Sequence, residues 1–599
     1  MSSTVNPDLV RERKNATFDT LQLTHFLYNG PERVRRKRYL QSLALEDPCI
    51  KNSPDWNTLS REEKYSEALR KNIYYVEQVN KLGLTDPAEM FLFRQAIAPH
   101  ETLPFALHTG MFLTTIERQA TEEQKARWLP LAYNYQMIGT YAQTELGHGT
   151  FVRGLETTAT FDPKTQEFVI DTPTLTSIKY WPGGFQSTSR NVMEDGTYIQ
   201  PKNSKVVYGT MVFIRSSICI NCAYSLAHGV TIATRYSAVR RQSELEAGNG
   251  EAQVIDYQTQ QHKIFPALAT AYALWFAGRH IMEIYLKVSF EMDKGSMKEL
   301  PTLHGMSAGV KALSSWSMAS FLETCRMACG GHGFSNASGF PKIYRDASPA
   351  ATYEGENTVM MLQTARFLLK CYAQMKHGEK PIGIMAYLNQ PLGGSSPLNS
   401  DLDLATLVSA FEHRALRLID EAASSVERLV LSGMSQTDAT NRSGVRLVAA
   451  AMAHCQCFVL SAFVEKVFDP QLDSRTRSVL KSVCQLFAVY TMLESLGEFM
   501  QDSYISQLQA SMLNSKLCDL LAEIRRNAVP LVDAFDFPDQ LLGSALGRYD
   551  GNVYEALFEY AKNSKLNNSD VIDAYYKYMK PFMEEQRRNM QGAAIASKL

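Results

Sequence analysis

The feature that most constrains the fold is a long apolar segment built largely from small residues. Residues 267–278 read Ala-Leu-Ala-Thr-Ala-Tyr-Ala-Leu-Trp-Phe-Ala-Gly and contain no charge. Alanine is the strongest helix former, and a helix that is apolar on all sides must be buried by its neighbours. Similar segments occur at 223–228 and 359–369. The sequence therefore predicts a mainly α-helical protein whose central helices lie inside a bundle.

The pattern along the chain divides it into successive blocks. Helical periodicity covers residues 1–137, gives way to residues rich in β-formers at 138–207, and returns over 208–388. A Gly/Pro/Ser-rich connector at 389–400 then leads to a last helical block, 401–599. This order favours two helical domains around a small antiparallel β-domain, followed by a C-terminal helical domain, over a doubly wound sheet.

The β-rich block contains a predicted hairpin. Residues 157–161 and 167–170 are strand-like and flank Asp-Pro-Lys-Thr-Gln, a typical turn composition. Residues 138–145 are also rich in β-formers, and Trp181–Gly184 predicts a sharp turn. Residues 185–205 are polar and irregular. We therefore expect few strands in this block.

Charge and cysteine content exclude several classes of protein. The chain has 61 Lys plus Arg against 62 Asp plus Glu, so it lacks the basic excess of a nucleic-acid binder. The run Arg33–Arg38 is compatible with a basic nuclear or nucleic-acid patch, but a solvated helix face is the favoured interpretation. Ten scattered cysteines predict buried free thiols, with no metal site. We expect neither a secretory signal peptide nor a membrane-spanning helix.

The last three residues carry targeting information. Ser597, Lys598 and Leu599 form the tripeptide that a peroxisomal import receptor reads at a free carboxyl terminus. Small residues precede it, so a receptor could reach it. The sequence therefore predicts a peroxisomal protein.

Three glycine-containing segments combine polar residues with apolar surroundings. In Thr140–Gly149, short hydroxyl and amide side chains beside glycines would let backbone N–H groups approach a planar ligand, although a strand followed by a turn has the same pattern. Trp181–Gly184 by itself indicates only a turn. Around His332, Gly330–Gly333 could cradle a pyrophosphate through main-chain N–H groups, or could be a left-handed helix C-terminus.

The fourth segment, Thr352–Thr358, contains two glutamates ahead of a predicted helix. Asn357 or Thr358 is the expected N-cap, and the helix dipole would favour acidic residues here in any case. Glu354, however, follows an apolar-aromatic run and precedes a glycine. A dry pocket at this position would raise the carboxyl pKa into the range of a general base.

Together these segments resemble the peroxisomal acyl-CoA oxidases, relatives of the acyl-CoA dehydrogenases. The similarity covers most of the chain and is carried by the following segments: Thr140–Gly149, Trp181–Gly184, Tyr208–Arg215, Asp256–Gln261, Cys329–Phe334, Glu354–Arg366, Asp533–Phe537, Gly547–Tyr554 and the terminal Ser-Lys-Leu. The C-terminal helical block is typical of the oxidases rather than of the shorter dehydrogenases.

The resemblance implies FAD-dependent desaturation of a fatty acyl-CoA to trans-2-enoyl-CoA, with O2 reduced to hydrogen peroxide. By motif, Glu354 would remove the Cα proton, Thr144 and Gly183 would contact FAD, and Glu356 would be structural. In the family, the backbone N–H of the catalytic glutamate and a flavin ribityl hydroxyl bind the thioester carbonyl. The loop Gly330–Gly333 resembles one that meets the cofactor across a dimer, so we expect a homodimer.

The chain departs from this family in one place. Only 23 residues, 185–207, separate Gly184 from Tyr208. The resemblance implies a longer interval here, so a block of about 70 residues, enough for several strands, is missing. Two hypotheses follow. Either the chain is a working oxidase with a minimal β-domain, or it is a non-catalytic, flavin-poor variant that dimerises with intact oxidase subunits.

Overall fold

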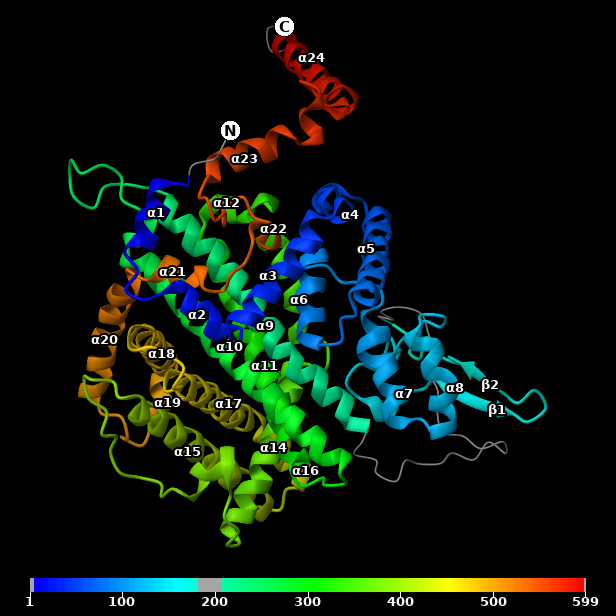
Figure 1. Ribbon diagram of the computed structural model, residues 1–599, viewed down its shortest axis with the longest axis vertical. Helices are drawn as coiled ribbons and strands as arrows, with labels where there is room; N and C mark the ends of the chain where they lie inside the picture. Colours follow the sequence, from blue (N-terminus) through cyan, green and yellow to red (C-terminus); the bar gives the residue numbers. More distant parts are fainter. Residues whose placement is uncertain (1–4, 181–206, 597–599) are drawn as a thin grey trace.

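The computed structural model describes residues 5–180 and 207–596, which form a mainly helical protein (Figure 1). The helices before the β-hairpin are α1 (Pro7–Lys14), α2 (Thr20–Leu27), α3 (Pro31–Glu46), α4 (Pro48–Lys51), α5 (Arg61–Leu82), α6 (Pro87–Ile97), α7 (Leu113–Gln119) and α8 (Glu122–Tyr133). Local sequence explains where they start. Ser60 and Thr121 each form a capping box with the residue three positions on, Glu63 and Gln124.

The first two helices pack differently from the six that follow. Leu9, Leu23 and Leu27 belong to the main hydrophobic core, in which α1 and α2 lie against α9 and α21. In contrast, α3, α5 and α6 surround a separate small core that includes Leu40 and Phe93. The beginning of the chain is thus fixed to the central bundle, and α3–α8 lie beside it.

A two-stranded antiparallel hairpin represents the β-block in the described residues. It consists of β1 (Thr158–Asp162) and β2 (Glu167–Asp171), with Thr160 opposite Val169, which confirms the predicted hairpin. The expectation of strand structure at 138–145 was wrong. That segment is irregular except for an isolated bridge between Glu145 and Lys179, because the described chain offers it no other strand to pair with.

The central helices confirm the predicted buried bundle. They are α9 (Val207–Val239), α10 (Gln258–Asp293), α11 (Leu300–Ala328), α12 (Gly330–Phe334), α13 (Phe340–Ala347) and α14 (Asn357–Lys376). Small residues let them approach closely, because a Cβ on Gly278 would lie 3.0 Å from the backbone N of Ile220 in α9. The apolar segment 267–278 is buried along its whole length within α10. Half-exposed and exposed residues of α10 lie only outside this segment.

The C-terminal helices share a core with the central ones. They are α15 (Leu404–Leu431), α16 (Gln436–Arg442), α17 (Gly444–Val467), α18 (Ser474–Glu494), α19 (Leu496–Met500), α20 (Gln507–Arg525), α21 (Ala528–Asp533), α22 (Asp539–Leu542), α23 (Val553–Lys562) and α24 (Lys580–Ala596). Helix α17 is long and apolar enough to cross a membrane by composition, yet it packs against α10, α14, α15 and α18 and is mostly buried. It behaves as a core helix.

The predicted connector is not a free spacer. The N–H of Ser396 donates to the Tyr504 carbonyl at 2.8 Å, and the Gln509 side chain donates to the Ser396 carbonyl at 2.8 Å. Leu398 is buried. The connector is therefore docked onto the helices that follow it, whereas α23 and α24 project away from the bundle (Figure 1).

Candidate active site

Glu354 lies in a tight turn between the short helix Ser348–Ala351 and α14. Its φ of 56° and that of Gly355, 104°, both fall in the left-handed region. A Cβ on Gly355 would lie 2.5 Å from Cε of Met360, at the flexible end of that side chain, so the left-handed conformation is the main reason for glycine here. A non-glycine residue held in this conformation is typical of a functional site, and this turn sets the direction of the Glu354 side chain.

One oxygen of the half-buried Glu354 side chain is enclosed without a hydrogen-bond partner among the described residues. This atom, Oε2, is inaccessible to solvent and, within residues 5–180 and 207–596, accepts no hydrogen bond. Burial raises the pKa of Glu354, and the positive charges of Arg215 and Lys311 oppose that rise. Such a carboxylate suits general-base chemistry, because a bonded and solvated one would be weaker.

Two buried cations hold the main chain of this turn. Nε of Arg215, on α9, donates to the Glu354 carbonyl at 3.1 Å, and Nζ of Lys311, on α11, donates to the Gly355 carbonyl at 2.6 Å. Burial lowers the pKa of Arg215, and its Nη1 has no partner among the described residues. The sequence contained Arg215 in a segment of the family resemblance, but neither cation was predicted as a site residue. A charged residue within an otherwise apolar helix was the available signal.

Glu356 has a structural role, unlike Glu354. It is the N-cap of α14, and its carboxylate accepts from the N–H groups of Thr358 at 2.9 Å and Val359 at 3.2 Å. The expectation that Asn357 or Thr358 caps this helix was therefore wrong. The side chain of Asn357 is instead fully buried and bonded to α11.

The segment Thr140–Gly149 is organised by Glu145 rather than by Thr144. The Glu145 carboxylate accepts from the N–H groups of Glu156 and Thr157 at 3.0 and 2.8 Å and contacts Lys179 at 3.3 Å. Thr144 is half-buried, and its carbonyl accepts from the N–H of Tyr180 at 3.1 Å. The sequence did not predict these hydrogen bonds of Glu145, because nothing in the local pattern separates a structural glutamate from any other.

The predicted flavin residues are only partly described. Gly183, with the whole turn 181–184, lies outside the described residues, as do Ser597, Lys598 and Leu599. On the side of Glu354, the residues fit a flavin-dependent dehydrogenation, because both the carboxylate and the Arg215 guanidinium carry buried atoms with no protein partner. Thr144 presents a hydroxyl-bearing side chain next to the hairpin.

The glycine loop at Gly330–Gly333 is a helix junction. Gly330 has a φ of 61° and follows the end of α11 as a left-handed C-terminal residue. Gly330, Gly331 and His332 are exposed, and Phe334 is 79% exposed. The helix-end interpretation is therefore correct for the backbone, and the loop remains open on the surface of the chain.

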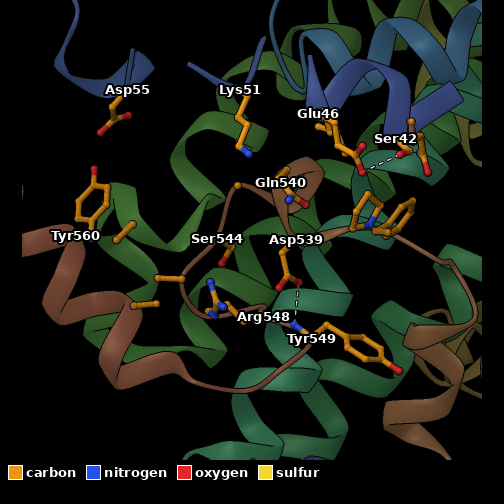
Figure 2. A pocket seen from close by; sticks show the side chains of 18 of the residues that line it. Ser42, Glu46, Lys51, Asp55, Asp539, Gln540, Ser544, Arg548, Tyr549 and Tyr560 are labelled. Carbon is orange, nitrogen blue, oxygen red and sulfur yellow. Dashed lines mark hydrogen bonds between the residues drawn. The ribbon is translucent and has the colours of Figure 1, made fainter. Parts of the chain in front are cut away.

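One cavity in the described part of the chain is separate from Glu354. It has a volume of about 890 Å³ and lies between α3, α4, α23 and the segment around Asp539. Figure 2 shows Lys51, Asp55, Ser544, Arg548 and Tyr560 around it. Neither Glu354 nor Thr144 lines this cavity, so it does not carry the chemistry that the sequence predicts.

The basic run Arg33–Arg38 is a set of ion pairs rather than a binding patch. Lys37 is fully buried and bonded to the Asp536 carboxylate at 2.8 Å, and Arg38 contacts the same carboxylate. Arg36 pairs with Glu89. The expectation of a solvated helix face was therefore wrong for Lys37, which points into the protein.

Fold and site together define a mainly helical protein with a buried, unbonded carboxylate at a strained turn. Three family models match this chain: the N-terminal part of acyl-coenzyme A oxidase over residues 19–138, the C-alpha1 domain of acyl-CoA oxidase over 208–369, and acyl-CoA oxidase over 403–584. None of these three matches reaches residues 139–207.

Known proteins agree with these matches over nearly the whole chain. Peroxisomal acyl-coenzyme A oxidase 1 of Rattus norvegicus is 41% identical, with 97% of this chain and 100% of the relative covered. Acyl-coenzyme A oxidase 1 of Drosophila melanogaster is 37% identical, with 97% and 99% covered. The structure of acyl-CoA oxidase-2 of Caenorhabditis elegans has a TM-score of 0.92 at 34% identity, with 98% and 99% covered. The chain belongs to the acyl-CoA oxidase family.

The alignment with the rat relative also measures the missing block. It runs over 662 positions, whereas this chain has 599 residues, so at least 63 positions lie opposite no residue of this chain. A missing block of several strands is consistent with this difference. The relative is therefore larger than this chain, although the two agree from end to end.

Proposed function

We propose that this chain catalyses the desaturation of a fatty acyl-CoA to trans-2-enoyl-CoA, with FAD as cofactor and O2 as electron acceptor. The observation that carries the proposal is the buried Glu354 carboxylate with an unbonded Oε2. A base in this state can take a weakly acidic proton from carbon without first losing a hydrogen bond. The structure of the C. elegans relative was solved with FAD, ascaroside-CoA and ATP bound.

In this mechanism Glu354 removes the proton at Cα of the thioester. Charge then develops on the thioester oxygen and must be stabilised by hydrogen-bond donors. The Glu354 N–H donates to no described residue and is the main-chain donor of this site. Thr144 and Gly183 would hold the FAD. When bound, this cofactor would accept the β-hydride and pass the electrons to oxygen.

Family membership and the terminal Ser597-Lys598-Leu599 support a peroxisomal location and recognition by an import receptor. The relatives from Rattus norvegicus and Mus musculus carry peroxisomal names. We further propose a homodimer, in which the exposed residues of the Gly330–Gly333 segment, namely Gly330, Gly331 and His332, and the exposed Phe334 would face the second subunit. We also propose that the N-terminal helical domain ends at residue 137, the β-domain at 207, the central helical domain at 388 and the connector at 400.

One observation favours the second candidate, a non-catalytic and flavin-poor partner of intact oxidase subunits. The two-stranded hairpin has all of β2 exposed, including Phe168 at 43% and Ile170 at 57%. In the alignment with the rat relative, at least 63 positions lie opposite no residue of this chain. A surface of this kind is normally covered by further strands. The flavin would then lack part of its wall.

The purified full-length chain separates the two candidates. The oxidase predicts a yellow protein with about one flavin per chain that forms hydrogen peroxide and trans-2-enoyl-CoA in equal amounts under air. A dehydrogenase passing its electrons to another flavoprotein would form enoyl-CoA with little peroxide. A colourless protein that forms neither product would overturn the proposal in favour of the non-catalytic partner.

A further inference from the structure

Lys311 is a fully buried lysine whose ammonium group points at the turn that carries Glu354. Nζ donates to the Gly355 carbonyl at 2.6 Å and to Oδ1 of Asn357 at 2.9 Å. Both acceptors follow Glu354 within three residues. Burying a lysine is costly unless its donors are satisfied, so these two bonds are the reason that its charge is tolerated.

Asn357 extends this contact into α11. Its side-chain amide donates to the Ala312 carbonyl at 3.2 Å and to the Ser315 hydroxyl at 2.9 Å. Since Asn357 is the first residue of α14, the bonds tie the start of that helix to the middle of α11. Lys311 is the charged member of this network, and its Nζ reaches the main chain of Gly355.

The carbonyls of Glu354 and Gly355 are thus held from two different helices. Arg215 of α9 holds the carbonyl of Glu354, and Lys311 of α11 holds that of Gly355. These two peptide planes flank Gly355 and are linked only through its φ and ψ, so fixing both fixes the left-handed conformation of Gly355. The first plane also begins at the Cα of Glu354, so it limits how the Glu354 main chain, and with it the carboxylate, can turn.

We propose that Lys311 is a positioning residue of this site, which holds the Glu354–Asn357 main chain in its left-handed turn and so aims the Glu354 carboxylate at the Cα proton. The inference deepens the proposed function and rests on it for the identity of that proton. Lys311 itself touches no substrate, because its side chain is enclosed by protein.

The first test measures main-chain order and needs no cofactor. Hydrogen exchange is followed by mass spectrometry in the full-length chain for the wild type, Lys311→Met and Lys71→Met. Lys71 is an equally buried lysine, bonded to Glu101 at 2.8 Å, and Lys342 still pairs with Glu101 when it is removed. We expect Lys311→Met to lose protection in the first turn of α14, residues 358–361, and Lys71→Met to leave it unchanged. Unchanged exchange in Lys311→Met, or an equal loss in both variants, would overturn the inference.

The second test separates positioning from general structural support. A displacement of about 1 Å costs roughly 100-fold in rate, so Lys311→Met should lose about 100-fold in kcat, with KM for the acyl-CoA changed less than about twofold. Loss of a nearby positive charge raises a carboxyl pKa, so the acidic limb of the pH–rate profile should move to higher pH. Lys311→Arg keeps the donors and should restore part of the rate. A rise in KM with unchanged kcat, or an unmoved acidic limb, would overturn the role of Lys311.

The outcomes also distinguish this inference from the proposed function. A colourless, inactive wild type whose Lys311→Met variant still loses protection at 358–361 would remove the proposed reaction and keep the main-chain role. A yellow, active wild type whose Lys311→Met variant is as active and as protected would keep the proposed reaction and remove the main-chain role of Lys311. If Lys311→Met does not fold, Lys311→Gln replaces it under the same criteria.

Discussion

Glu354 and Glu356 lie two residues apart, yet of their two side chains only that of Glu356 is hydrogen-bonded to the rest of the described chain. The carboxylate of Glu356 accepts two N–H groups at the start of α14, whereas Oε2 of Glu354 is buried with no partner in the described residues. Glu356 therefore caps helix α14, whereas the side chain of Glu354 is left without a hydrogen bond. This contrast is the main structural argument that Glu354 acts chemically.

Glu354→Gln should remove activity without removing the fold. General-base catalysis contributes about 10²- to 10⁴-fold, so we expect at least about a 100-fold loss in kcat. Thermal unfolding at neutral pH should occur at or above the temperature of the wild type, because glutamine carries no charge at this half-buried position. An active Glu354→Gln variant would exclude Glu354 as the base.

Glu356→Ala is the matched variant and should behave in the opposite way. Loss of an N-cap costs about 1 kcal/mol, so denaturant unfolding should show a reduction of that size in the free energy of unfolding. Flavin content and the acidic limb of the pH–rate profile should be retained, because the Glu356 side chain is bonded to the helix. A loss of activity equal to that of Glu354→Gln would show that the two glutamates share one role.

The pH dependence follows from the burial of Glu354. Burial raises its pKa above the ordinary value of 4.5, and the base must be deprotonated, so kcat/KM should fall tenfold per pH unit below the raised pKa. A carboxyl with a raised pKa stabilises the fold below pH 4.5, and this stabilisation is lost as the pH rises through its folded pKa. Unfolding of the wild type and Glu354→Gln should therefore converge at low pH and differ, in favour of Glu354→Gln, at neutral pH. A kcat/KM that stays level through the acidic range would contradict this.

Two cations of helix α3 test the ion pairs of the basic run. Lys37→Met removes a buried cation from the partly buried Asp536 carboxylate, which keeps only Arg38 as a charged partner among the described residues, and should cost about 3 kcal/mol. Arg35→Met is the control, since Arg35 and its partner Glu32 are both mostly exposed, and it should cost less than about 0.5 kcal/mol. Equal costs, measured by urea unfolding, would show that Lys37 is not held as described.

The exposed face of β2 provides a test of the β-block. Ile170→Ser should change the free energy of unfolding by less than about 0.5 kcal/mol, because Ile170 is 57% exposed. Ala269→Ser, at a fully buried position of α10, is the contrasting variant and should cost more. A large cost at Ile170 would show that this face is covered, for example by a second copy of the chain.

Sequence patterns predicted the helical bundle and the β-hairpin correctly because both depend on local composition and periodicity. The small-residue segment of α10 and the turn between β1 and β2 are examples. The contacts of Lys311 with Gly355, and of Lys37 with Asp536, could not be predicted, since each joins residues far apart in the chain. Likewise, the local pattern favoured Glu354 as the base only through the apolar-aromatic run before it and the glycine after it, because helix capping and a dry pocket both accept a glutamate. The separate roles of Glu354 and Glu356 came from the resemblance.

The most direct test of the central claim is anaerobic reduction of the purified full-length chain by a saturated acyl-CoA. The account predicts a visible flavin absorbance that bleaches within one turnover in the wild type and recovers on admission of oxygen. It also predicts that this absorbance persists in Glu354→Gln. A wild type without flavin absorbance, or a Glu354→Gln variant that bleaches as fast as the wild type, would contradict it.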